Sequence, residues 1–216
     1  GALMATVAVV DYGMGNLRSV AKAIEHVAPA GERVQVTRDP GELAAAERIV
    51  FPGQGAARDC MLELERRGLR APLLDAARAK PFLGICMGMQ VLMERSEENG
   101  GTACLGLYLG EVRFFGHDLK DATGAKLKIP HMGWNQVWQA RPHPIWDGIP
   151  DGERFYFVHS YHVVPEDPEF ALGTTDYGIR FVSAIARGNV AAVQFHPEKS
   201  AEAGLSLLRN FLHWNP

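Results

Sequence analysis

A cysteine between two glycines is the residue of this chain best placed for chemistry, because Cys86 stands in the pattern Gly84-Ile85-Cys86-Met87-Gly88. An apolar run leads into it and helix-forming residues follow at once, which predicts a nucleophile on a sharp strand-to-helix turn. Such a turn is crowded, and glycines on either side relieve the crowding. The adjacent helix start would stabilise a thiolate, and the amide of Met87 would point at a developing oxyanion. The alternative, a buried core cysteine, is disfavoured by the flanking glycines.

A second segment supplies a base for that thiol. The apolar residues 192–195 lead to His196, and Glu198 follows two positions later. Residues i and i+2 of an extended chain project to the same side, so Glu198 is predicted to orient the His196 ring. Pro197 between them discourages further strand pairing. A surface histidine is the alternative for this segment alone, but together with Cys86 it favours a Cys-His-Glu triad.

A third segment, Pro52-Gly53-Gln54-Gly55, follows another apolar run directly. Its glycines let the backbone approach a ligand and let a peptide rotate. The chemical interpretation is a second oxyanion donor, a backbone amide near Gln54, whose rotation provides a place for a switch. An ordinary tight turn explains this segment equally well when it is taken alone.

Strands and helices that alternate along the first half of the chain must position these three segments. Apolar runs predict strands at 6–10, 34–37, 48–51 and 81–85, and helical periodicity predicts helices at 17–28, after Pro40, at 61–67 and at 71–80. This alternation is typical of a parallel sheet with helices on both faces.

The second half of the chain has a different pattern, with strands separated by turn residues. These strands are expected at 108–115, 135–139, 155–164, 171–174, 182–186 and 189–195, and a last helix at 203–213 with Ser200 as its cap. The fold class is therefore α/β, a single domain over residues 5–216 with a mostly parallel central sheet, flanking helices and antiparallel additions. Residues 1–4 are expected to be a cloning remnant plus the native start.

Composition excludes several classes of function. The 216 residues carry a net charge of −3, so there is no basic excess for nucleic acid. No apolar run reaches the roughly 18 residues of a membrane span. Three cysteines, an odd number, argue against a disulfide framework and favour a reducing, cytoplasmic compartment. Cys60 and Cys104 lack the surroundings of Cys86 and are expected to be structural.

No metal site is predicted, because His159 and His162 would face opposite sides of a strand. The segment 11–16 lacks the third glycine of a dinucleotide-binding loop and favours a partner or hinge contact. Trp134, Trp138 and Tyr156 could be core or interface residues.

Three motifs identify a family. Pro52-Gly53, Gly84 to Gln90 and Phe195 to Glu198 resemble, in this order, the signatures of the class I (triad) glutamine amidotransferases. The segments 11–17, 130–135, 156–161 and 194–200 resemble the branch whose members are glutaminase subunits of a synthase in histidine biosynthesis. The resemblance runs from about residue 5 to 214 and implies a flavodoxin-like fold. Gln54 departs from the small or β-branched residue of many relatives, so the role of its side chain stays open.

The resemblance also implies the roles of individual residues. Cys86 would attack the side-chain amide of glutamine, His196 would move the proton and Glu198 would orient His196, with water then hydrolysing a glutamyl thioester. The oxyanion hole would lie at Gln54 and Met87. Glutamine would be contacted by Gly53, Gly55, Gln90, Glu98, Ser160 and Tyr161. For Gln90 and Glu98 the alternative is an exposed helix residue and one member of a solvated acidic run.

A partner is implied as well. The ammonia would pass to a (β/α)₈ cyclase subunit, HisF, in a heterodimer that forms imidazole glycerol phosphate and AICAR without a cofactor. The triad should face a sealed interface, because free ammonia would leak into water. Asn16, Trp134 and Tyr156 would lie at that interface, and Trp134 would be an anchor.

Three alternatives remain. The glutaminase subunit of pyridoxal phosphate synthase shares the triad, but the segments 11–17 and 130–135 argue against it. A Cys-His peptidase is more distant. A non-catalytic binding protein that kept the fold is disfavoured by the intact triad.

Overall fold

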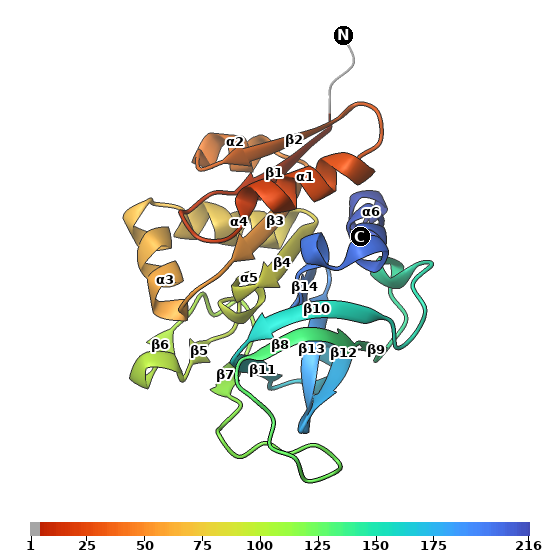
Figure 1. Ribbon diagram of the computed structural model, residues 1–216. Helices are drawn as coiled ribbons and strands as arrows, with labels where there is room; N and C mark the ends of the chain where they lie inside the picture. Colours follow the sequence, from red (N-terminus) through yellow and green to blue (C-terminus); the bar gives the residue numbers. More distant parts are fainter. Residues whose placement is uncertain (1–4) are drawn as a thin grey trace.

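Five parallel strands form one side of a twelve-stranded sheet (Figure 1). The structure, a computed structural model, describes residues 5–216, so the expected remnant at residues 1–4 lies outside the described residues. These parallel strands, in their order from the edge of the sheet, are β2 (Glu32–Thr37), β1 (Ala5–Val10), β3 (Arg48–Gly53), β4 (Phe82–Cys86) and β14 (Val190–Val193). Each of these strands pairs with its neighbour in parallel, as predicted.

The predicted antiparallel additions continue the sheet beyond β14. These strands are β13 (Ile179–Arg187), β11 (Tyr161–Pro165), β7 (Gly110–Phe114), β5 (Arg95–Ser96) and β6 (Thr102–Ala103). In addition, β12 (Ala171–Tyr177) pairs with β13, and β9 (Trp138–Gln139) pairs with β12. All these pairings are antiparallel except that of β5 with β7. A separate antiparallel pair, β8 (His131–Gln136) and β10 (Arg154–His159), crosses in front of β13 in the view of Figure 1.

The strand predicted at 155–164 is broken at Ser160. Its first half is β10 in the small sheet, and its second half is β11 in the large sheet. Ser160 itself lines the cavity described below. The burial pattern changes at the break, because β10 alternates buried and more exposed residues whereas β11 buries two consecutive residues, His162 and Val163.

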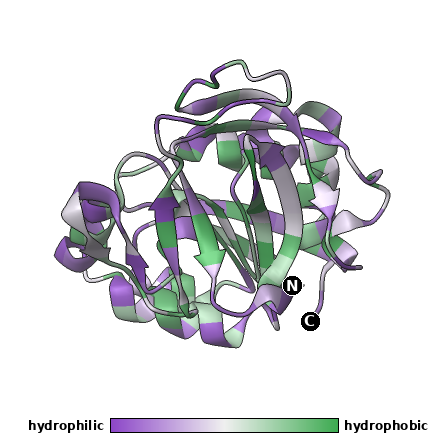
Figure 2. Ribbon diagram, turned by 90° about the horizontal axis from the view of Figure 1, so that it is seen from below, coloured by the Kyte–Doolittle hydropathy of each residue, from purple (hydrophilic) through white to green (hydrophobic). Residues whose placement is uncertain are grey.

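Helices cover both faces of the parallel strands (Figure 1). On one face lie α1 (Leu17–Val27) and α6 (Ala201–His213), and on the other α2 (Pro40–Ala45), α3 (Ala57–Arg66) and α4 (Arg70–Ala79). The alternation of β1 accounts for this arrangement: Val7 and Val9 pack with α1 and α6, while Ala8 and Val10 pack with the other helices. The outer helices mix hydrophilic and hydrophobic residues along their length, because each buries one face (Figure 2).

Short helical turns complete the chain. They are α5 (Met87–Gln90) and the 3₁₀ turns η1 (Glu98–Gly100), η2 (Pro144–Trp146), η3 (Pro168–Phe170) and η4 (Pro197–Lys199). Within residues 5–216, the structure contains no helix of the length and apolar character that a membrane span requires.

The caps of α2 and α6 differ from one another. Asp39 caps α2 by accepting a hydrogen bond from the amide of Gly41 at 2.9 Å, with Pro40 at the first helical position. Ser200 precedes α6, but its side chain makes no capping bond, so that prediction is wrong. Its hydroxyl donates to the carbonyl of His196 at 2.6 Å and accepts from the amide of Tyr156 at 2.9 Å.

Candidate active site

Cys86 lies at a strained turn between β4 and α5. Its φ of 56° and ψ of −112° are rare for a residue with a side chain. Both flanking glycines are required sterically, since a Cβ on Gly84 would lie 2.6 Å from the carbonyl oxygen of Gly88, and a Cβ on Gly88 would lie 1.9 Å from that of Phe51. The strand–elbow–helix arrangement predicted from the glycine spacing is therefore present.

Three neighbouring parallel strands bring the sequence motifs together at one edge of the sheet. Gly53 at the end of β3 is paired with Cys86 at the end of β4. On the other side of β4, β14 leads into Gln194 and His196. Because parallel strands end at the same edge, three segments far apart in the sequence meet there.

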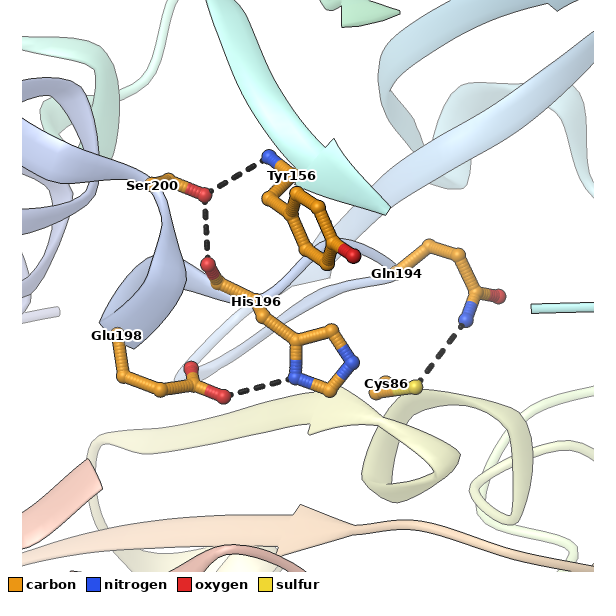
Figure 3. A network of polar contacts seen from close by, with 6 residues as sticks. All are labelled: Cys86, Tyr156, Gln194, His196, Glu198 and Ser200. Atoms are coloured by element: carbon orange, nitrogen blue, oxygen red, sulfur yellow. Dashed lines mark hydrogen bonds and ion pairs between the residues drawn. The ribbon is translucent and has the colours of Figure 1, made fainter. Parts of the chain in front are cut away.

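His196 and Glu198 form an ion pair with almost fully buried side chains. Nδ1 of His196 lies 2.7 Å from Oε1 of Glu198 (Figure 3). The other edge of the ring faces Cys86 (Figure 3), and Nε2 makes no hydrogen bond to the described residues. The pairing was predicted for an extended chain, but Glu198 stands in the turn η4, which also brings it back to His196.

The electrostatics of the pair favour a protonated imidazole. Burial alone would lower the pKa of His196, but the proximity of Cys86 and the bond and charge of Glu198 outweigh it and raise the pKa to about 10. An imidazolium beside Cys86 stabilises a thiolate. The arrangement thus has the chemical capacity to generate a nucleophile and to return a proton to a leaving group.

The backbone around His196 is held by two elements. Its amide donates to the carbonyl of Tyr156 in β10 at 2.9 Å, and Ser200 bridges the same two residues (Figure 3). The helix α6 packs closely against η4, so that a Cβ on Gly204 would lie 1.9 Å from the carbonyl oxygen of Pro197.

A cavity of about 420 Å³ opens in front of Cys86 and His196. Most of the residues predicted to bind glutamine or an oxyanion line it. These are Gln54, Gly55, Met87, Gln90, Glu98, Ser160 and Tyr161. Gly53 is not among the lining residues, since it lies under Tyr12 and Met87. Glu198 lies behind His196, as an orienting residue should.

Gln90 and Glu98 have contacts that hold them in place. Nε2 of Gln90, a buried residue, donates to Gln194 Oε1 at 3.0 Å and to the carbonyl of Tyr161 at 3.2 Å. Oε1 of Glu98 accepts from the amide of Ala57 at 2.7 Å. Gln90 is therefore no exposed helix residue, and Glu98 is held at the cavity rather than free in solvent.

The segment Pro52 to Gly55 is anchored from behind by two buried side chains. The Tyr12 hydroxyl donates to the carbonyl of Pro52 at 2.9 Å, and Cys60 Sγ lies 3.7 Å from the carbonyl of Gln54. Gly55 has a φ of 90°. Burial raises the pKa of Cys60 to about 12, which agrees with its structural role.

The residues predicted to contact a partner belong to two segments that adjoin residues of the cavity lining. Tyr156 faces Trp134 across the β8–β10 pair, with ring centroids 6.1 Å apart, and Trp134 is 50% exposed. Val158 of β10 lines the cavity beside them. Asn16 is exposed in the loop after β1, and this loop packs on the segment Pro52 to Gly55.

His159 and His162 do not face opposite sides, contrary to the prediction. The break at Ser160 turns both rings onto Phe115, with centroids 5.2 and 4.8 Å from it. Burial lowers the pKa of His159 to about 3. Among residues 5–216, no three His, Cys, Asp or Glu side chains group as metal ligands.

Several polar residues that are buried near the site were given no role in it from the sequence. The main ones are Tyr12, His131, His159 and Gln194. Gln194 had a detectable signal, because a glutamine inside an otherwise apolar buried strand needs a hydrogen-bond partner. The other three carried no such signal.

This combination of an α/β sheet, a cysteine elbow and a buried His–Glu pair defines the class. Residues 8–214 match the glutamine amidotransferase class-I family, and the chain belongs to it. Solved structures with the same fold include PurLQS from Thermotoga maritima (TM-score 0.69, 21% identity, 97% of this chain and 98% of that one). The glutaminase domain of Trypanosoma brucei CTPS with bound acivicin is another (TM-score 0.62, 17% identity, 99% and 96%).

Curated relatives place the chain in one group of subunits within this family. The imidazole glycerol phosphate synthase subunit HisH of Thiobacillus denitrificans is 64% identical over 97% of this chain and 92% of its own length. The HisH subunit of Aromatoleum aromaticum is 62% identical over 99% of this chain and 100% of its own length. At this level of identity, the chain is a member of the HisH group within the class I family.

Proposed function

We propose that the chain is the glutaminase subunit of an imidazole glycerol phosphate synthase and hydrolyses glutamine to glutamate and ammonia. The observation that carries this proposal is the His196 ring, which lies between Glu198 and the strained Cys86 at the wall of a cavity. Membership of the HisH group supports the choice of glutamine as the substrate.

The reaction uses two displacements at one carbon atom. The Cys86 thiol gives its proton to His196, and the sulfur attacks the side-chain amide carbon of glutamine. Backbone amides at Gln54 and Met87 stabilise the resulting oxyanion. The carbon–nitrogen bond then breaks as His196 protonates the nitrogen, which leaves as ammonia. Water, deprotonated by His196, hydrolyses the thioester to glutamate and restores the thiol.

Glutamine is held by the far side of the cavity. The nitrogen of the Gln90 side chain is used by Gln194 and Tyr161, so its oxygen is the group left to accept from the substrate ammonium. Glu98 carries a carboxylate for the same ammonium, and Ser160 and Tyr161 line the same cavity as Gln54 and Gly55.

The ammonia goes to a cyclase subunit of the HisF type, a (β/α)₈ barrel, in a heterodimer. Subunit naming of the relatives implies a complex. The β8–β10 pair offers the docking surface, because Met132 and Trp134 are 62% and 50% exposed beside the cavity. We further propose a cytoplasmic location, on the ground that Cys60, Cys86 and Cys104 are all free thiols.

The deciding experiment is Cys86→Ala in a complex reconstituted with the cyclase subunit. Glutamine-dependent synthesis should vanish, because the nucleophile is lost. Synthesis from added ammonium salt should match the wild type, because the partner needs only ammonia. Failure of external ammonia to restore synthesis would show that the two subunits do not divide the work in this way.

A labelling experiment separates the rival activities. A glutamine-analogue electrophile should modify Cys86 in the wild-type chain, and excess glutamine should protect it. Peptide hydrolysis without glutamine hydrolysis would favour the peptidase interpretation instead.

A further inference from the structure

Gln194 is a completely buried side chain beside the nucleophile, on the side away from His196 (Figure 3). Its Nε2 lies 3.7 Å from Cys86 Sγ, within hydrogen-bond range for sulfur. Its backbone amide donates to the carbonyl of Ser183 at 2.8 Å, which fixes the backbone just after β14. The mechanism above gives this residue no role.

We propose that Gln194 is a catalytic residue whose side-chain N–H donates to the Cys86 sulfur whenever that sulfur carries negative charge. The proposal rests on the glutaminase function and adds a group to its machinery. A neutral amide keeps its proton, unlike His196, so the same donor serves twice. It favours the thiolate before attack and again when the thioester breaks and sulfur leaves.

The neighbouring hydrogen bonds determine which end of the Gln194 amide faces the sulfur. Gln194 Oε1 accepts from Nε2 of Gln90 at 3.0 Å, so the oxygen is turned away and the nitrogen is left for Cys86. A flipped amide would set two N–H groups of Gln90 and Gln194 against each other and place an oxygen on the sulfur. The flip would therefore lose one bond and create a repulsion.

A second set of bonds fixes Gln90 in turn. Its remaining N–H donates to the carbonyl of Tyr161, which also accepts from His159 Nδ1 at 2.8 Å. With its proton on Nδ1, neutral His159 presents Nε2 as an acceptor to His131 Nδ1 at 2.9 Å. Nε2 of His131 then accepts from Asn135 Nδ2 at 3.1 Å.

Each hydrogen bond in this series thus has an assigned donor and acceptor, from Asn135 in β8 to Cys86. Burial lowers the pKa of His131 to about 4 and that of His159 to about 3, so both rings stay neutral and keep these directions near pH 7. Such a series is ordered before substrate arrives, as electrostatic stabilisation requires.

The test uses two variants that keep the shape of the side chain. Gln194→Met removes the donor, and Gln194→Glu replaces the N–H₂ group by an oxygen. The measurement is the rate of Cys86 alkylation by iodoacetamide as a function of pH, with peptide mapping to identify the modified thiol. Burial raises the pKa of Cys60 to about 12 and that of Cys104 to about 11, so neither should compete.

We expect the midpoint of the alkylation profile to rise by about one pH unit in Gln194→Met, and further in Gln194→Glu. Glutaminase kcat should fall at least about tenfold in both, with KM changed less than about threefold. The matched control is Thr175→Val, which breaks a buried 2.8 Å bond to Ser183 outside this series. Its alkylation profile and kcat should equal those of the wild type.

An unchanged alkylation profile in a folded Gln194→Met would overturn the proposal. If circular dichroism shows that this variant does not fold, Gln194→Glu decides by the same criterion. Loss of folding in both would make Gln194 a structural residue and would equally refute a catalytic role. Alkylation needs no glutamine turnover, so it tests the Gln194 donor independently of the proposed function. If the wild-type chain had no glutaminase activity but the Gln194 variants still shifted the alkylation profile, the proposed function would be contradicted and the role of Gln194 as a donor to Cys86 would stand.

Discussion

The His196 ring and the Glu198 carboxylate have different roles in catalysis, and the loss of one should cost more activity than the loss of the other. Nδ1 is held by Glu198 at 2.7 Å, while the other edge of the ring faces Cys86 (Figure 3). The ring itself moves protons in both halves of the reaction, whereas the carboxylate only orients the ring and stabilises its positive charge. The loss of the ring should therefore cost more than the loss of the charge behind it.

His196→Ala should lower kcat by about 10²–10⁴, the usual range for a general acid–base. Glu198→Gln should lower kcat less, because an amide oxygen can still accept from Nδ1. Steady-state glutamine hydrolysis by the two variants in the same complex measures the difference. Equal losses would mean that Glu198 has a more direct part than orientation.

At the scale of elements, the position of His196 depends on how α6 meets η4. Gly204 of α6 has no room for a methyl group, because a Cβ there would lie 1.9 Å from the carbonyl oxygen of Pro197. The contacting atom belongs to the backbone of Pro197, which cannot move aside as the flexible end of a long side chain could. Any substitution must therefore displace either the helix or the turn that carries Glu198.

Gly204→Ala should lower the free energy of unfolding by about 1–3 kcal/mol through overpacking, although alanine favours a helix. It should also lower kcat, since the turn shifts relative to Cys86. Urea denaturation and glutaminase assays check both effects. Glu202→Ala, an exposed position on the same helix, is the control and should change stability by less than about 0.5 kcal/mol. A Gly204→Ala variant with wild-type stability and activity would show that the contact can relax.

Elements that depend on local pattern could be predicted from the sequence, and contacts across the fold could not. The five parallel strands and the Cys86 elbow follow from apolar runs and glycine spacing. The break at Ser160 does not, because it depends on which sheet each half joins. Ser200 precedes a helix and has the residue type of a cap, yet a carbonyl and an amide from two other segments occupy its hydroxyl.

At the site, too, features that depend on local pattern could be predicted and contacts between distant residues could not. Cys86, His196 and Glu198 could be selected by residue type and spacing, although the geometry behind the His–Glu pair is a turn and not a strand. Gly53 was expected to touch substrate because glycine permits close approach, but the group that approaches is the Tyr12 hydroxyl. The series from Asn135 to Gln194 joins residues up to 104 positions apart, and no local pattern encodes such contacts.

The whole molecule buries neutral histidines, which makes its stability depend on pH. Burial lowers the pKa of His131 to about 4 and of His159 to about 3, against about 6.5 in the unfolded chain. Below about pH 6.5 the unfolded chain takes up protons that the folded chain does not, so the free energy of unfolding falls as pH falls. The raised pKa of His196 acts in another window, because its stabilising contribution is lost as pH rises from about 6.5 to about 10.

Between about pH 6.5 and 5.5, each of these two buried imidazoles should remove on the order of 1 kcal/mol of stability. His131→Phe should reduce the slope of the free energy of unfolding against pH by the equivalent of about one proton. Thr175→Val removes no titrating group and should keep the wild-type slope. Urea denaturation at several pH values gives the slopes. A wild-type slope in His131→Phe would mean that His131 titrates alike in the folded and unfolded chain.

Activity should also depend on the partner, through the contact between two loops at the same sheet edge. The loop after β1, which we expect to meet the cyclase, packs on the oxyanion segment: a Cβ on Gly15 would lie 3.4 Å from the Gly53 backbone, and a Cβ on Gly55 would lie 3.1 Å from Met14. Because glycines flank Gln54, we expect the peptide between Gly53 and Gly55 to have two orientations that differ by only a few kcal/mol. A partner that presses on the loop can therefore select one orientation.

The isolated chain should accordingly be a poor glutaminase, and the cyclase subunit with its nucleotide ligand should switch it on. One oxyanion donor is worth about 10²–10³ in rate, which sets the size of the expected stimulation. Steady-state glutamine hydrolysis by the chain alone, with the cyclase, and with the cyclase plus nucleotide measures it, with Cys86→Ala giving the background. Stimulation below about threefold would leave no room for a rotating donor, since even a partly misaligned N–H costs more than that.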